Sequence, residues 1–133
     1  MKNIVVIAHD VKKSEMVQFL NERKDWIYGV KLIATGRTAE FVESHGIKVE
    51  HLSPGESGGY VEITDRIKRK EIDIVIFLRD PLLKQGHHED IQFLLEACNV
   101  NNIPLATNYA SAELIILGQI KKEDYERRKS REE

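Results

Sequence analysis

The sequence predicts a three-layer α/β/α protein built on a mainly parallel five-stranded sheet. Short apolar runs rich in β-branched residues alternate with segments whose apolar residues have helical spacing, and this alternation is typical of βαβ units. The length of 133 residues fits one domain. A domain of about this size buries roughly two-thirds of the surface of its unfolded chain, so it needs no disulfides to fold.

The first two expected strands flank the first expected helix. Residues 4–8 form a continuous apolar run, as expected of a strand that is buried on both faces. Residues 12–23 place four apolar side chains near helical spacing, and these are Met16, Val17, Phe19 and Leu20. Residues 30–34 are the second expected strand, which Thr35 and Gly36 end.

The middle of the chain continues the alternation. We expect a helix at residues 38–45, with Gly46 as its C-terminal stop. Residues 49–52 are the third expected strand. After a loop that contains glycines, apolar residues at helical spacing predict a helix from residue 61 to about residue 70.

The last third holds the clearest strand, residues 72–78. In residues 89–99 the apolar side chains form a helix stripe, made of Ile91, Leu94, Leu95 and Cys98. Residues 104–107 are the fifth expected strand, and residues 111–117 are a last helical segment.

The composition limits the classes of partner and the compartment. A net charge of −2 does not indicate a nucleic-acid partner. No apolar stretch approaches the roughly 18 residues that span a membrane, and the apolar start is too short for a secretory signal. The single cysteine, Cys98, permits no intramolecular disulfide, which fits a reducing compartment. We therefore expect a cytoplasmic protein with neither a nucleic-acid nor a membrane partner.

The organisation predicted is one domain, residues 1–120, followed by a charged C-terminal tail, residues 121–133. The tail carries charges of both signs almost without interruption. Such a segment is typical of a solvated helix or a frayed terminus.

Polar residues follow all five expected strands, where ligands bind in parallel sheets. In chain order they are His9, Asp10 and Lys13; Thr35, Gly36, Arg37 and Thr38; Ser53 and Gly55; Asp80, His87 and Asp90; and Thr107 and Asn108. Their convergence predicts one pocket rim that carries hydroxyls, cations, carboxylates and imidazoles. The start of the helix after the second strand suits a phosphate, because its backbone N–H groups are unpaired. Lys13 and Arg37 would supply the countercharge.

Other interpretations of these residues remain open. Asp10, Thr35 and Thr38 are also common helix-capping residues, Asp80 followed by proline is also an ordinary turn, and Asp90 is also an ordinary charge at a helix start. The sequence predicts no metal, because it has neither a His-x-x-x-His pair nor enough cysteines for a structural zinc site. Cys98 is expected in the core.

Five short motifs resemble those of the methylglyoxal synthase family, in the same order, from residue 3 to about residue 117. They are Ile-Ala-His9-Asp10-x-x-Lys13, Ala34-Thr35-Gly36-x-Thr38, Asp73-Ile-Val-Ile-Phe-x-x-Asp80-Pro81-Leu82, His87-x-x-Asp90 and Ile103-Pro104-Leu-Ala-Thr107-Asn108.

The resemblance implies a homohexameric lyase that uses no cofactor and no metal. It would convert a small phosphorylated substrate, dihydroxyacetone phosphate, to methylglyoxal and phosphate through an enediolate, with phosphate as an allosteric ligand. By similarity, the phosphate would be held by Lys13, Thr35, Thr38 and Ser53. From their places at the same strand ends, Gly36, Arg37 and Gly55 are added to the predicted phosphate site. The catalytic side chains would be His9, Asp10, Asp80, His87 and Asp90, with His87 polarising the carbonyl.

The loop after residue 52 departs from the family's pattern, Ser-Gly-Pro-x-Gly-Gly-Asp-Gln-Gln. It is one residue longer, and Tyr60 stands where the family has the Asp that is its leading candidate for the proton-abstracting base. Arg37 stands where a second Thr is usual, and Pro54 removes one backbone donor. Tyr60 is a poor replacement base, because the ordinary pKa of tyrosine is about 10. The carboxylates left open as replacements are Glu56, Glu62, Asp10 and Asp90.

Two functions follow from these observations. The first is a methylglyoxal synthase with a rearranged base, which the presence of Asp10, Asp80, His87 and Asp90 favours. The second is a catalytically altered relative that binds a phosphorylated metabolite or phosphate without turnover.

Overall fold

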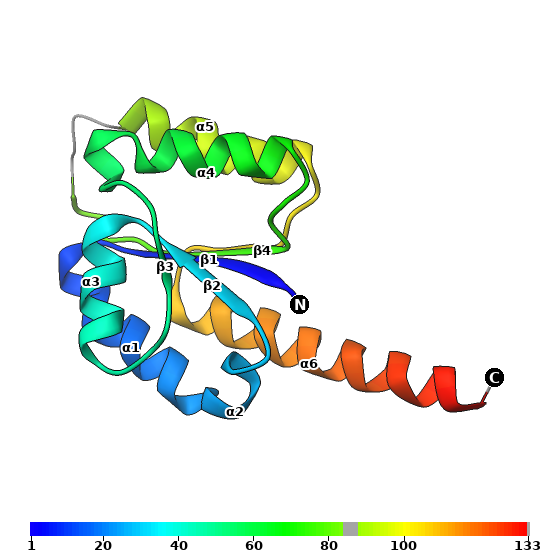
Figure 1. The fold of residues 1–133 in the computed structure, drawn as a ribbon. Coiled ribbons are helices and arrows are strands. Elements are labelled where there is room, and N and C mark those ends of the chain that lie inside the picture. Colours follow the sequence, from blue (N-terminus) through cyan, green and yellow to red (C-terminus); the bar gives the residue numbers. More distant parts are fainter. Residues whose placement is uncertain (84–87, 133) are drawn as a thin grey trace.

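The computed structural model describes residues 1–83 and 88–132. The five strands of these residues form one parallel sheet in the order β3-β2-β1-β4-β5 (Figure 1). They are β1 (Asn3–Ala8), β2 (Lys31–Ala34), β3 (Glu50–His51), β4 (Ile74–Leu78) and β5 (Leu105–Ala106).

Helices cover both faces of the sheet (Figure 1). On one face lie α4 (Gly59–Lys68) and α5 (His88–Val100). On the other lie α1 (Lys13–Glu22), the short α2 (Lys24–Ile27), α3 (Gly36–Ser44) and α6 (Tyr109–Glu132). The predicted α/β fold with a parallel five-stranded sheet is therefore confirmed.

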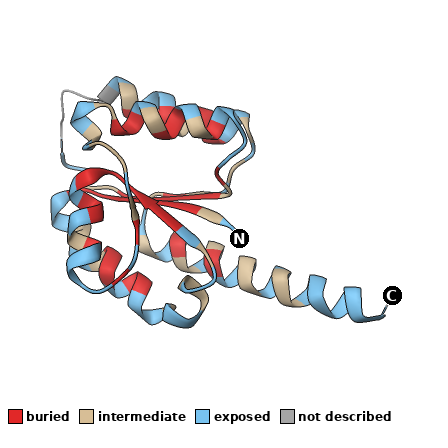
Figure 2. Cartoon of the chain, viewed as in Figure 1, coloured by how far each residue is buried: buried red, intermediate tan, exposed pale blue. Residues whose placement is uncertain are grey.

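The central strand β1 divides the core into two clusters. Its side chains alternate, so that Ile4 and Val6 face α1, α3 and α6, whereas Val5 and Ile7 face α4 and α5. All four are at most 1% exposed, and Figure 2 shows the buried residues along the strands and the inner helix faces. Burying one such side chain contributes about 1.5–3 kcal/mol. The carboxyl end of β1 is therefore held rigidly.

The structure differs from the sequence prediction mainly at element ends. Helix α3 begins two residues earlier than predicted, at Gly36, and α4 also begins two residues earlier, at Gly59. Strands β3 and β5 have two residues each, because edge strands pair on one side only. Helix α2 and the two 3-10 turns, Asp10–Lys12 and Gly55–Ser57, were not predicted, since such short pieces show no period.

Helix α6 is one continuous helix of 24 residues, where the sequence predicted a helical segment and a separate charged tail. Its first half packs on β5 and α1, and side-chain contacts extend the docking beyond the predicted division at residue 120. The Trp26 indole Nε1 donates to Glu123 Oε2 at 2.9 Å, and the Arg23 guanidinium pairs with Glu113 at 3.0 Å. Of the two predicted states of the tail, the helix is the one observed.

Among residues 1–83 and 88–132, no helix combines the length and the apolar character needed to cross a membrane.

Two glycine-to-alanine changes are expected to move stability in opposite directions. At Gly59 a Cβ would lie 2.2 Å from the Ser53 carbonyl oxygen, so Gly59→Ala must displace the loop and should cost about 1–3 kcal/mol. At Gly118, in α6, a Cβ meets nothing within 4 Å, so Gly118→Ala should add about 0.5–1 kcal/mol through helix propensity. Urea unfolding of both variants checks this; an unchanged midpoint for Gly59→Ala would contradict the close packing of the loop.

Candidate active site

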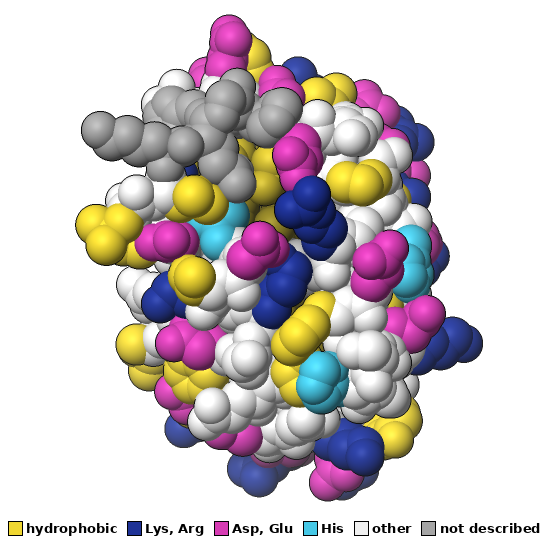
Figure 3. Space-filling model, turned by 90° about the vertical axis from the view of Figure 1, so that its left-hand side faces the viewer, with side chains coloured by type: hydrophobic (Ala, Val, Ile, Leu, Met, Phe, Trp, Pro, Cys, Tyr) yellow, Lys and Arg dark blue, Asp and Glu magenta, His cyan; other side chains and the backbone are white. Residues whose placement is uncertain are grey.

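A cavity of about 280 Å³ lies at the carboxyl ends of the strands. Of the residues predicted for the site, it is lined by His9, Asp10, Lys13, Thr35, Arg37, Thr38, Gly55 and Asp80. Figure 3 views this edge, where charged side chains of both signs gather around a hollow beside a histidine. The structure therefore brings together residues from the ends of β1, β2 and β4 and from the loop after β3.

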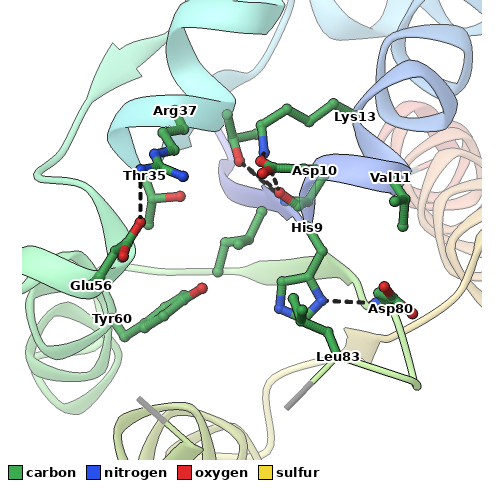
Figure 4. Close-up of a pocket in the computed structure, with 14 residues that line it drawn as sticks. His9, Asp10, Val11, Lys13, Thr35, Arg37, Glu56, Tyr60, Asp80 and Leu83 are labelled. Atoms are coloured by element: carbon green, nitrogen blue, oxygen red, sulfur yellow. Dashed lines mark hydrogen bonds and ion pairs between the residues drawn. The ribbon is translucent and has the colours of Figure 1, made fainter. Parts of the chain in front are cut away.

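His9 is the residue directly after β1, and its imidazole is held in one orientation. Its Nδ1 accepts the backbone N–H of Asp80 at 2.8 Å, and its ring lies edge-on to Phe77 with centroids 5.2 Å apart. The residue is 6% exposed, and Nε2 has no hydrogen-bond partner in the described part of the chain. In Figure 4 this nitrogen faces away from Asp80, toward the space that Tyr60 borders.

Burial is the main cause that lowers the pKa of His9, and the nearby charge of Arg79 lowers it further. The imidazole is therefore neutral near pH 7. Because Nδ1 accepts a hydrogen bond, the ring proton is on Nε2. The cavity wall thus carries an unpaired N–H donor, which suits an oxygen atom of a ligand.

Lys13 lies at the first position of α1 and points back to the end of β1. Its Nζ donates to the Ala8 carbonyl oxygen at 3.0 Å and to Asp10 Oδ1 at 2.6 Å. An ammonium has three donors, so one has no partner among residues 1–83 and 88–132 and is available to a ligand. The hydrogen bond and the charge of Lys13 hold the pKa of Asp10 below its usual range. Asp10, whose side chain is 76% exposed, is therefore ionised. It is not a helix N-cap, because His9 and Lys12 occupy the N-cap positions of the 3-10 turn and of α1.

The start of α3 forms the opposite wall of the cavity. Thr35 precedes the helix, but its hydroxyl makes no capping hydrogen bond, so it is available to a ligand. The Thr38 hydroxyl accepts the N–H of Ala8 at 3.1 Å and contacts the Ala8 carbonyl oxygen at 3.3 Å. Neither threonine caps α3. The first N–H groups of a helix have no partner within it, and that of Gly36 is taken by the Ser53 carbonyl oxygen at 3.2 Å.

The loop between β3 and α4 is fixed by one carboxylate. Glu62 accepts the Ser53 hydroxyl at 2.6 Å and the Ser53 N–H at 3.1 Å. Ser53 is not among the described residues that line the cavity, nor is Gly36. The predicted contact of these two residues with phosphate therefore stays a prediction, and Glu62 is occupied as a loop support.

Tyr60, at the position of the family's Asp, borders the cavity as a buried aromatic side chain. It is 6% exposed and stacks on Phe77 with centroids 5.8 Å apart. A Cβ on Gly55 would lie 2.5 Å from its Cζ, so the loop needs glycine there. Burial first, and then the charge of Glu56, raises the pKa of Tyr60. The phenol is therefore un-ionised and is a donor, not a base.

The remaining predicted residues lie partly elsewhere. Asp80 lines the cavity, and its Oδ1 also accepts the Leu82 N–H at 3.0 Å, so the turn interpretation holds too. Asp90 is in the first turn of α5 and is not among the described lining residues. His87 lies outside the described residues. Cys98 is fully buried in the core, and burial raises the pKa of its thiol to about 11, as expected of a core residue.

The sequence analysis missed the apolar part of the lining. Ile7, Ala8, Val11 and Leu83 complete the cavity wall. Only their positions in the sequence could have identified them, because each lies in or within a few residues of the end of a strand. Among the described residues, no three His, Cys, Asp or Glu side chains come together in a group that could hold a metal ion.

The comparison with known proteins agrees with this geometry. The model of the MGS-like domain family matches residues 15–107. The chain belongs to this family. Over 117 residues it is 49% identical to methylglyoxal synthase of Thermoanaerobacterium thermosaccharolyticum, covering 87% of each chain. It is 43% identical to methylglyoxal synthase of Thermus thermophilus over 117 residues, which are 87% of this chain and 93% of that protein.

A solved structure shows the same fold. The crystal structure of methylglyoxal synthase from Elizabethkingia anophelis superposes with a TM-score of 0.80 at 35% identity, covering 86% of this chain and 76% of that one. For this member of the MGS-like family, the structural similarity therefore extends over most of the chain.

The protonation state of His9 leads to a test. Because its folded-state pKa is lowered below the ordinary value, the unfolded chain takes up a proton first as the pH falls through about 6.5. Stability should therefore fall below that pH, until the folded-state pKa is reached, and this part of the loss should vanish in His9→Gln. Long-range ¹H–¹⁵N spectra of the imidazole nitrogens should show that His9 is the neutral Nε2–H tautomer. In the control variant His45→Gln, the His9 signals and the loss of stability at low pH should remain. An Nδ1–H tautomer, or a pKa at or above 6.5, would contradict the assignment.

Proposed function

We propose that this chain is a methylglyoxal synthase, a lyase that converts dihydroxyacetone phosphate to methylglyoxal and inorganic phosphate without a cofactor. One observation carries the proposal: a buried neutral imidazole, His9, presents an unpaired N–H in a cavity whose other wall suits a phosphate. In Figure 4, Lys13, Thr35 and Arg37 lie on one side of the cavity, and His9 and Asp80 lie on the other. The curated names of the relatives support the same reaction.

The phosphate would bind between α1 and α3. Two donors of the Lys13 ammonium have partners among the described residues, which leaves its third donor for the phosphate. The Thr35 hydroxyl makes no capping hydrogen bond, and the N–H groups of Arg37 and Thr38 lie at the start of α3. A helix N-terminus and a cation favour a dianion in the same place. These groups also stabilise the phosphate when it leaves.

The carbon chain would reach toward His9. A carboxylate removes a proton from the hydroxymethyl carbon, and the carbonyl oxygen gains charge as the enediolate forms. The His9 Nε2–H donates to this oxygen, as a neutral imidazole can. We expect His87 to assist, as the family resemblance implies. Asp80 orients His9 through its N–H, and Asp10 and Asp90 complete the predicted acid–base groups.

The enediolate then breaks the carbon–oxygen bond to phosphate. Phosphate leaves with the electron pair of that bond and takes the proton of the substrate's hydroxyl group, whose oxygen becomes the aldehyde carbonyl. The enolate that remains takes up a proton at its methylene carbon to give methylglyoxal. The apolar lining and the buried Tyr60 keep water from the enediolate, which suppresses side reactions.

The finer features of the family are also proposals here. They are a homohexameric assembly, phosphate as an allosteric ligand and a cytoplasmic location. The alternative function, binding a phosphorylated metabolite or phosphate without turnover, is favoured by one observation, the replacement of the family's Asp by a buried tyrosine with a raised pKa.

The direct test is to incubate the purified protein with dihydroxyacetone phosphate and to measure methylglyoxal and phosphate together. We expect equal release of both, well above the uncatalysed elimination. His9→Gln should lower kcat by about 10²–10³-fold, the effect of losing one donor to a developing oxyanion. The matched control is His45→Gln, an exposed histidine at the end of α3, which should retain full activity.

A different result would support the alternative function. If neither product appears, but dihydroxyacetone phosphate or inorganic phosphate raises the melting temperature, the cavity is a binding site without turnover.

A further inference from the structure

Arg37, which departs from the family's pattern, contacts the loop that is one residue longer than in the family. Arg37, where a second threonine is usual, lies at the start of α3, and Glu56 lies in the lengthened loop before α4. The Arg37 Nη2 and the Glu56 Oε1 are 3.1 Å apart, and both residues line the cavity. Figure 4 shows the pair bridging the cavity wall next to Thr35 and above Tyr60. The departures are therefore one local rearrangement.

The other carboxylates that the sequence left open are less suited to remove a proton. Glu62 is held by the hydroxyl and the N–H of Ser53. Asp10 is held by Lys13, which lowers its pKa and so weakens it as a base. Asp90 is not among the described residues that line the cavity.

Glu56 differs from these three in its partner. Arg37 lies at the helix start that suits a phosphate, so a bound phosphate ester can take over its guanidinium as a two-point donor. The Glu56 carboxylate then loses its only ion-pair partner among the described residues while it remains in the cavity wall. Its side chain is 46% exposed in the free protein, and a bound substrate would remove part of that water. Both changes make a carboxylate a stronger base.

We infer that Glu56 is the carboxylate that takes the proton from the substrate carbon in this chain, in place of the family's Asp. The assignment rests on the proposed function. The proton of the hydroxymethyl carbon moves to a Glu56 oxygen, and the electron pair of that C–H bond becomes the double bond of the enediolate. Phosphate leaves with the pair of the C–O bond. As phosphate leaves, the proton of the substrate's hydroxyl group passes to it and that hydroxyl oxygen becomes the aldehyde carbonyl, so the enolate of methylglyoxal remains. Glu56 then returns its proton to the methylene carbon of this enolate, which restores the carboxylate and gives methylglyoxal.

Arg37 is a positioning residue in this scheme. Its guanidinium pairs with Glu56 in the empty site and with the phosphate group of the substrate in the occupied site. Arg37→Thr, which restores the family's usual residue, should therefore raise KM more than it lowers kcat.

The experiment compares Glu56→Gln, Glu56→Asp and the control Glu40→Gln, an exposed change on α3. Glu56→Gln should lower kcat by about 10²–10⁴-fold while inorganic phosphate still raises the melting temperature as in the wild type. Exchange of the substrate's hydroxymethyl hydrogen with D₂O should be lost in parallel. Glu56→Asp should recover part of the activity, and Glu40→Gln should be unchanged.

Three results would overturn the assignment, and they are distinguishable. If the wild-type protein releases neither product, both the proposed function and the assignment of Glu56 as the base are wrong. An active wild type whose Glu56→Gln variant keeps at least a third of kcat removes Glu56 alone, and loss of activity in Asp90→Asn would then identify the base. If Glu56 had a purely structural role, Glu56→Gln would lower the melting temperature, and the remaining folded protein would exchange the substrate hydrogen at the wild-type rate.

Discussion

The candidate site depends on the hydrogen-bond partners of the backbone N–H and C=O of Ala8, the last residue of β1. Ala8 is 4% exposed, and a buried peptide group needs hydrogen-bond partners. Its carbonyl oxygen accepts Lys13 Nζ and contacts the Thr38 hydroxyl, and its N–H donates to the same hydroxyl. The backbone N–H and C=O of this one residue thus join the central strand to α1 and α3. Because His9 is the next residue, the imidazole lies between a lysine and a helix start.

This arrangement explains which parts were predictable from sequence. The buried strands follow from continuous β-branched runs, and the convergence of His9, Lys13, Thr35 and Asp80 follows from parallel topology, since strand ends share an edge. Both depend on local patterns and on one general rule. The continuity of α6 was not predictable from composition, because its charged half is held through Glu123 by Trp26 and its first half through Glu113 by Arg23, and both partners lie about ninety residues away in the chain.

The loop before α4 was predictable in composition but not in its contacts. Its glycines permit close approach, as at Gly55 beneath the Tyr60 ring and Gly59 against the Ser53 carbonyl. The sequence does not show that Glu62 turns back to Ser53 or that Glu56 turns to Arg37. Each pair joins side chains on different elements, so only the folded loop decides which carboxylate faces the cavity.

The electrostatics of the cavity limit what it binds. Among the described lining residues, both cations already have a carboxylate partner: Lys13 has Asp10, and Arg37 has Glu56. A singly charged anion gains little by competing with these pairs, because the carboxylate that it displaces must be solvated again. A phosphate dianion at the start of α3 can take over the Arg37 guanidinium, accept the third donor of Lys13 beside Asp10 and accept the helix N–H groups, so it displaces the Glu56 carboxylate and leaves Asp10 paired. Under the proposed assignment of Glu56, binding the phosphate and freeing the base are therefore the same event, and a substrate without the phosphate would find Glu56 still paired.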